Sequence, residues 1–204
     1  MISNGKFYES QFEEATIELL REAHWQYAFG DDIHRKYTDP LIEEDLRNFL
    51  TVQYKDKNLT TSEMDSIVAN LRNTGGQNDY YALRNTFLLY RDGYDFAYSD
   101  GRSNPFRLEY IDFEHPDHNI FRCVNQFVME QGRENRRPDI LLFINGIPVC
   151  IIELKNPTKQ NATIHDAHTQ ICTRYMRDIP ALLKYCALAV ISDGAKNALG
   201  ATYT

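Results

Sequence analysis

Long apolar stretches, paired cysteines and low-complexity tracts are all scarce in this chain of 204 residues. The longest apolar runs, residues 147–152 and 186–191, have the length of strands, whereas a membrane helix needs about 20 apolar residues. Four scattered cysteines are too few for a disulfide scaffold, and the first residues lack the apolar segment of a secretory signal. We therefore expect a cytoplasmic protein without membrane partners.

Charge is divided unevenly along the chain, although the total is only -7. From residue 133 onward nine basic residues outnumber six acidic ones, so that this last third carries +3 and residues 1–132 carry -10. An acidic total argues against a nucleic-acid partner, but the split allows a phosphate-binding surface in the last third. Ordinary variation of surface charge explains the same split.

The first half of the chain has the periodicity of helices. Four helices are predicted from apolar residues at helical spacing and from cap and stop residues. The first covers residues 11–23, and the second begins at Asp39-Pro40 and includes Leu50. The third begins at a Thr60/Glu63 capping box and stops at Gly75-Gly76. The fourth lies around residues 81–90 and ends at Asp92-Gly93.

The second half alternates like strands. Residues 106–110 and 121–129 are predicted strands, and residues 132–137 a polar loop. Asn145-Gly146 between two apolar runs predicts a hairpin of residues 140–144 and 147–154. A helix at 164–176 and a strand at 186–192 complete a right-handed βαβ crossover, which predicts an α/β protein with helices covering a sheet.

Three polar residues interrupt this hydrophobic hairpin. Asp139 stands at the entrance of its first strand, and Glu153 and Lys155 share one face of the second because side chains alternate along a strand. Two carboxylates there can bind Mg²⁺, which prefers oxygen ligands, and the lysine can orient a water and neutralise charge on a phosphate. An ion pair between Glu153 and Lys155 at a strand end is the simpler interpretation.

The hairpin context favours the catalytic interpretation. Pro138-Asp139 and Glu153-Leu154-Lys155 resemble the PD-(D/E)XK nuclease motif, and the string from Arg137 to Pro157 is similar to the nuclease core of the R (motor) subunit of type I restriction enzymes. The resemblance covers most of the chain. It implies a restriction-endonuclease-like core, a mixed sheet flanked by helices, after a mostly helical N-terminal region. It also implies Mg²⁺-dependent cleavage of double-stranded DNA and assembly with specificity and methyltransferase subunits.

The resemblance also assigns roles to individual residues. Asp139 and Glu153 become metal ligands and Lys155 the catalytic lysine. The family has a Gln and a Tyr one helical turn apart after the lysine. The nearest match here, Gln170 and Tyr175, is five residues apart, a spacing that turns the two side chains about 140° from each other on an α-helix.

Further candidates come with two interpretations each. An acidic residue of the first helix approaches the metal in such nucleases, which points to Glu13 or Glu14 without choosing between them; either is equally a solvated helix residue. Arg133, Arg136 and Arg137 either contact DNA phosphates or form a solvated loop. The His-x-x-His pairs that begin at His115 and His165 have a metal-site spacing but no evident partner ligand, so that we expect surface histidines.

No phosphate-binding Gly-x-x-x-x-Gly-Lys-Ser/Thr string is present. We therefore expect a single nuclease domain, residues 1–204, with a mainly helical part (1–105) and a catalytic α/β core (106–204), as the N-terminal fragment of a longer subunit. ATP would be bound only by motor lobes of that subunit. The alternatives are a non-catalytic DNA-binding or subunit-docking module that keeps the nuclease core, and a free-standing repair or recombination nuclease.

Overall fold

The computed structural model describes residues 9–155, 164–194 and 196–202. The helices are α1 (Glu9–Glu22), α2 (Glu43–Gln53), α3 (Thr61–Asn73), α4 (Asp79–Asp92), α5 (Ile164–Thr169), α6 (Met176–Asp178), α7 (Pro180–Leu183), the π-helix η4 (Gln170–Tyr175) and the 3-10 turns η1 (Gly30–Asp32), η2 (Lys55–Lys57) and η3 (Pro116–His118). The strands are β1 (Gln26–Phe29), β2 (Tyr94–Phe96), β3 (Phe106–Leu108), β4 (Phe121–Asn125), β5 (Met129–Gln131), β6 (Glu134–Arg136), β7 (Ile140–Ile144), β8 (Ile147–Leu154), β9 (Leu188–Ser192) and β10 (Asn197–Ala201).

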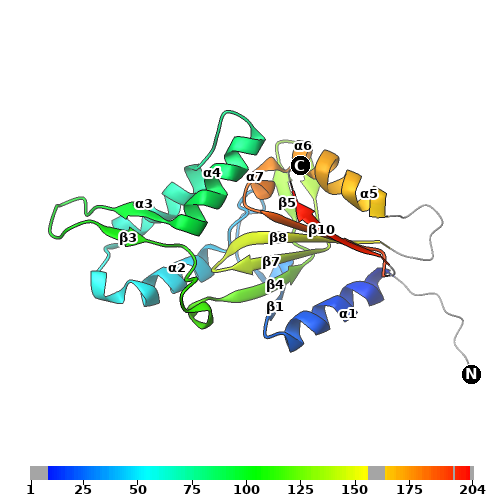
Figure 1. Ribbon diagram of the computed structural model, residues 1–204, viewed down its shortest axis with the longest axis horizontal. Coiled ribbons are helices and arrows are strands. Elements are labelled where there is room, and N and C mark those ends of the chain that lie inside the picture. The colour runs from blue at the N-terminus through cyan, green and yellow to red at the C-terminus, as the bar shows by residue number, and fades with distance from the viewer. Residues whose placement is uncertain (1–8, 156–163, 195, 203–204) are drawn as a thin grey trace, which may run out of the picture.

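A six-stranded mixed sheet organises the molecule, in the order β1-β4-β7-β8-β9-β10 (Figure 1). β7 and β8 form the predicted hairpin, whose turn residues Asn145 and Gly146 both have positive φ, 51° and 75°. β8 and β9 run parallel, as the predicted βαβ crossover requires, and β1 adds a parallel edge strand beside β4. The mixed sheet flanked by helices, and the helical region before it, are confirmed.

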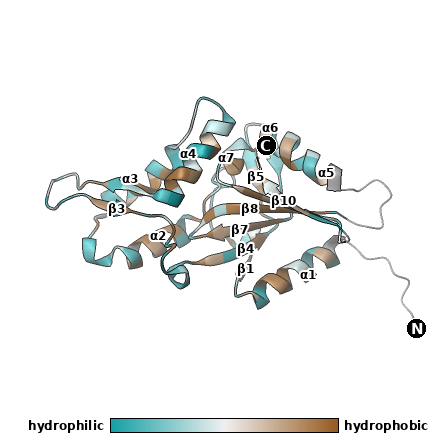
Figure 2. Ribbon diagram, viewed as in Figure 1, coloured by the Kyte–Doolittle hydropathy of each residue, from teal (hydrophilic) through white to brown (hydrophobic). Residues whose placement is uncertain are grey.

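Helices cover the two faces of the sheet (Figure 1). Ile17 of α1 packs against Ile140 and Ile152 on one face, whereas Ile171 of η4 packs on the other face in a cluster that includes Ile151. The strands of the sheet are accordingly hydrophobic along most of their length (Figure 2). The side chains of Ile151 and Glu153 leave the same face of β8, because residues two apart in a strand do so. Glu153 is therefore directed toward η4.

Helices α2, α3 and α4 pack together in the N-terminal half, where Leu46, Ile67 and Leu71 are fully buried. The predicted capping box of α3 is present. The Thr60 hydroxyl accepts a hydrogen bond from the Glu63 backbone N–H, and the Glu63 carboxylate accepts one from the Thr60 backbone N–H. α4 ends at Asp92 and Gly93 caps it, as predicted.

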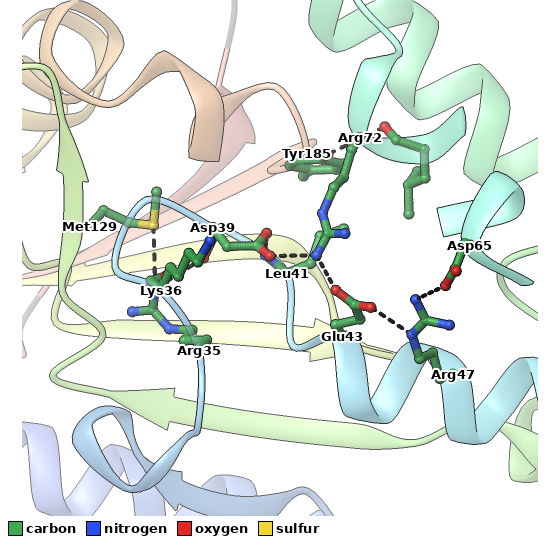
Figure 3. Close-up of polar contacts among 11 residues, drawn as sticks. Arg35, Lys36, Asp39, Leu41, Glu43, Arg47, Asp65, Arg72, Met129 and Tyr185 are labelled. Atoms are coloured by element: carbon green, nitrogen blue, oxygen red, sulfur yellow. Dashed lines mark hydrogen bonds and ion pairs between the residues drawn. The ribbon is translucent and has the colours of Figure 1, made fainter. Parts of the chain in front are cut away.

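A chain of ion pairs connects α2 and α3 with the segment before α2 (Figure 3). The Arg72 guanidinium contacts the carboxylates of Asp39 and Glu43, and Arg47 contacts Glu43 and Asp65. The prediction that Asp39 caps a helix is therefore wrong, because α2 begins only at Glu43. The Asp39 carboxylate instead accepts from the Leu41 backbone N–H and binds Arg72.

The predicted strand of residues 121–129 and the predicted loop of residues 132–137 are each wrong in part. β4 ends at Asn125 because Gln126 takes a positive φ of 56°, which breaks the extended backbone. The following residues form a separate small hairpin of β5 and β6, which includes much of the expected loop. β3 pairs with β2 outside the main sheet. Among the described residues, no helix combines the length and apolarity that crossing a membrane requires.

Candidate active site

The predicted catalytic residues meet at one end of the β7–β8 hairpin. Ile140 pairs with Ile152, so that Asp139, which precedes β7, lies beside the end of β8 that carries Glu153. The Asp139 carboxylate accepts a hydrogen bond of 2.7 Å from the backbone N–H of Leu154. The hairpin register therefore fixes both carboxylates with respect to each other.

Glu153 is buried and its two oxygens are held from three sides. The Lys155 ammonium lies 2.8 Å from Oε1, which also accepts a hydrogen bond from the Gln170 amide. The Tyr175 hydroxyl donates to Oε2 over 3.2 Å. Lys155 also donates to the Gln170 carbonyl oxygen at 2.9 Å, so that Glu153, Lys155, Gln170 and Tyr175 form one connected network.

The environment of Glu153 favours its neutral form. Burial raises its pKa to about 7, the negative charge of Asp139 acts in the same direction, and Lys155 opposes both. Asp139 contributes because the hairpin register sets it beside the end of β8 that carries Glu153. A buried carboxylate with a raised pKa beside a second, partly buried carboxylate is typical of functional sites.

A π-helical turn brings Gln170 and Tyr175 together. The Gln170 amide donates to the Tyr175 hydroxyl at 2.6 Å, so the expectation that the five-residue spacing separates their side chains is wrong. The physical reason is that η4 is a π-helix, which has more residues per turn than an α-helix and aligns residues i and i+5. The extra residue relative to the family spacing is accommodated within this turn.

Removing one residue from η4 is expected to preserve the fold. Deleting the exposed Thr173 converts the π-turn to an α-turn and puts Tyr175 one position nearer, four residues after Gln170. The matched control deletes Ser66 from the regular helix α3, which turns the residues after it by about 100° and removes Ile67 from the core. In urea unfolding the first variant should unfold cooperatively near wild type, and the second should lose more than about 3 kcal/mol. Equal losses would contradict the assignment.

Glu13 and Glu14, left open by the sequence, have different surroundings. Glu13 accepts hydrogen bonds from Asn125 at 2.7 Å and from Gln126 at 3.1 Å, at the end of β4 that adjoins the start of β7. Glu14 is exposed to solvent. α1 packs on the face of the sheet opposite to Glu153, so Glu13 reaches the strand ends from the other side, and its role at the metal stays a prediction.

The predicted arginines have different surroundings. Arg136 contacts the carboxylates of Asp178 and Glu134, both at 2.6 Å. Arg137 is exposed and lines a polar pocket of about 440 Å³ together with Gln170, Tyr175 and Arg174. Arg133 is exposed in the turn between β5 and β6. Their contact with DNA stays a prediction.

Comparison with known proteins decides the family. The family model described as the type I restriction enzyme R protein N terminus matches residues 6–204. This chain belongs to that family. The type I restriction enzyme HindI endonuclease subunit of Haemophilus influenzae is 31% identical over 94% of the chain, and the putative MjaIXP endonuclease subunit of Methanocaldococcus jannaschii is 31% identical over 92%. The chain spans about a fifth of the length of these curated relatives, 19% of each.

One arrangement of side chains in this R-protein N terminus was not predicted from the sequence. Asp112, buried just before η3, lies beside the exposed His115 and His118 and adds a carboxylate to the His-x-x-His pair. The signal was the spacing Asp-x-x-His-x-x-His in residues 112–118. His168 is exposed as expected, whereas the side chain of His165 lies outside the described residues.

Proposed function

We propose that this chain is the nuclease part of a type I restriction enzyme R subunit, and that it hydrolyses phosphodiester bonds of double-stranded DNA with Mg²⁺. The observation that carries the proposal is the convergence of Asp139 and Glu153 at one hairpin end, with Lys155 bound to Glu153 on the same face. Membership of the R-protein family supports it.

The donor set fits a magnesium ion. Asp139 and Glu153 offer carboxylate oxygens, the ligands that Mg²⁺ prefers, from the adjoining strand ends that the hairpin register sets side by side. When bound, the ion would supply charge for the phosphoryl oxygens and a water of lowered pKa. Each of the two carboxylates must be ionised to bind it, and a cation there stabilises the ionised form of Glu153.

The remaining residues hold and neutralise the reacting groups. Gln170 and Tyr175 fix the orientation of the Glu153 carboxylate through hydrogen bonds to both of its oxygens. The Lys155 ammonium, held between Glu153 and Gln170, supplies a positive charge for the phosphate and a donor for the attacking water. Arg137 on the adjoining polar pocket supplies a contact for a neighbouring phosphate.

The activity of the whole subunit belongs to the same proposal. We infer that the chain works within a longer R subunit that couples cleavage to ATP-driven DNA translocation and assembles with specificity and methyltransferase subunits. The names of the relatives, endonuclease subunits of type I restriction enzymes, support this inference.

Calorimetric titration of the chain with Mg²⁺ tests whether the carboxylates form a metal site. We expect Asp139→Asn to weaken binding at least about tenfold, because it removes one of the two anionic ligands. Asp95→Asn is the matched control, since Asp95 is an exposed carboxylate of β2 that pairs with Arg107. The absence of binding by the wild type, or equal binding by Asp139→Asn, would instead support a docking module that keeps only the nuclease fold.

A further inference from the structure

Three metal-ligating side chains converge in the loop between β3 and β4. Asp112, His115 and His118 each present one ligand atom, and these atoms lie within 4.8 Å of one another. The Nδ1 atoms of His118 and His115 are 3.0 and 3.6 Å from Asp112 Oδ2. Ligand atoms about 2.0–2.2 Å from a tetrahedral zinc ion are roughly 3.3–3.6 Å apart. The His115 separation matches this range, and the shorter His118 separation would widen by a few tenths of an ångström around an ion.

The Asp112 carboxylate is buried and fixed in position. Oδ1 accepts from the backbone N–H groups of Glu114 and His115 at 3.0 and 2.8 Å, and Oδ2 accepts from the Gln53 amide at 3.0 Å. Only 4% of the residue is exposed. Hydrogen bonds of this kind orient carboxylate ligands in metal sites and preserve their charge.

The two imidazoles are both turned to the same carboxylate oxygen. Their rings stack with centroids 4.9 Å apart and an angle of 18° between the planes. His118 is within hydrogen-bond distance of Oδ2, but the 3.6 Å from His115 exceeds it. Both nitrogens are thus directed to the oxygen that a bound cation would share with them. Both side chains are at least half exposed, so they can rotate to converge and leave further coordination positions to water.

This cluster is separate from the proposed nuclease centre. Its loop is tied to the hairpin turn, because the Asn145 amide donates to Asn119 Oδ1, which accepts the Asp112 backbone N–H. Asn145 and Asp139 lie at opposite ends of β7, about 20 Å of strand apart. An ion bound here would join the loop to Gln53 at the end of α2 and would not take part in DNA hydrolysis.

We propose that Asp112, His115 and His118 form a binding site for a borderline transition-metal ion, Zn²⁺ before others, with water in the remaining coordination position. Two imidazoles and one carboxylate suit Zn²⁺, whereas Mg²⁺ prefers oxygen ligands alone. The site stands independently of the proposed nuclease activity, since no residue is shared between them.

Competition of this chain with a chromophoric chelator for Zn²⁺ tests the site. The titration contains excess Mg²⁺ to fill an oxygen site, and Cys172→Ser serves as the background, because Cys172 is half-buried and lies 3.5 Å from His168. We expect one Zn²⁺ per chain. His115→Ala and His118→Ala should each weaken binding at least about tenfold, and Gln53→Ala should weaken it about tenfold through the carboxylate.

His34→Ala is the matched control, because His34 is an exposed histidine elsewhere on the surface, and it should bind Zn²⁺ like the background chain. Zn²⁺ should also raise the Tm of the background chain and leave that of the His115→Ala/His118→Ala double variant unchanged. The proposal is overturned if the background chain takes up no Zn²⁺, or if the double variant retains its affinity.

Discussion

Lys155→Ala and Asp139→Asn should each abolish DNA cleavage by the R subunit in its assembled complex, with a rate loss of at least about 10³-fold. Lys155 is the cation that Glu153 holds at the strand end, and Asp139 is one of two metal-binding carboxylates in the proposal. Positioned charge of this kind typically contributes several kcal/mol to the transition state. The measurement is conversion of supercoiled plasmid to linear DNA with ATP and Mg²⁺ present.

Two controls make this result specific. Lys57→Ala and Asp95→Asn remove charges of the same sign from ion pairs far from the hairpin end, and both should leave cleavage unchanged. Circular dichroism and thermal unfolding of each variant chain report whether the fold persists. Full cleavage by Lys155→Ala or by Asp139→Asn would refute the assigned nuclease centre and leave the chain as a DNA-binding or docking module.

The stability of the metal-free chain should fall as pH rises from about 4.5 to about 7. Burial raises the pKa of folded Glu153 to about 7, with the Asp139 charge acting in the same direction, whereas the ordinary value is 4.5. The folded state therefore keeps a proton that the unfolded state loses first. The stabilisation is complete below the unfolded pKa and is lost as pH passes the folded pKa, by up to about 3 kcal/mol.

Urea unfolding at pH 4.5 and pH 8 checks this expectation. Glu153→Gln, which cannot ionise, should lack the fall in unfolding free energy that the wild type owes to Glu153. Glu130→Gln, which changes an exposed residue of β5, is the control and should show the same fall as the wild type. Mg²⁺ affinity of the wild type should rise over the same pH interval, because the ion competes with the proton of Glu153. An identical pH dependence in wild type and Glu153→Gln would contradict the raised pKa.

Local signals in the sequence were sufficient for much of the fold. The Thr60/Glu63 capping box, the Gly93 helix end and the Asn145-Gly146 turn act over a few residues, and each forms as predicted. The helix start predicted at Asp39-Pro40 was wrong because the Asp39 carboxylate binds Arg72, which is 33 positions away in the sequence. The short strand β1 escaped prediction because it is defined by pairing with β4, about a hundred residues later.

The sequence by itself determined which residues carry charge on the hairpin, since alternation along β8 places Glu153 and Lys155 on one face. Tertiary structure decided how these groups work together. The π-turn that joins Gln170 to Tyr175 contradicts α-helical spacing, and the burial that raises the pKa of Glu153 comes from helices packed on the sheet. The loop that brings His115 and His118 to Asp112 is likewise fixed by hydrogen bonds to α2 and to the hairpin turn, contacts between segments far apart in the sequence.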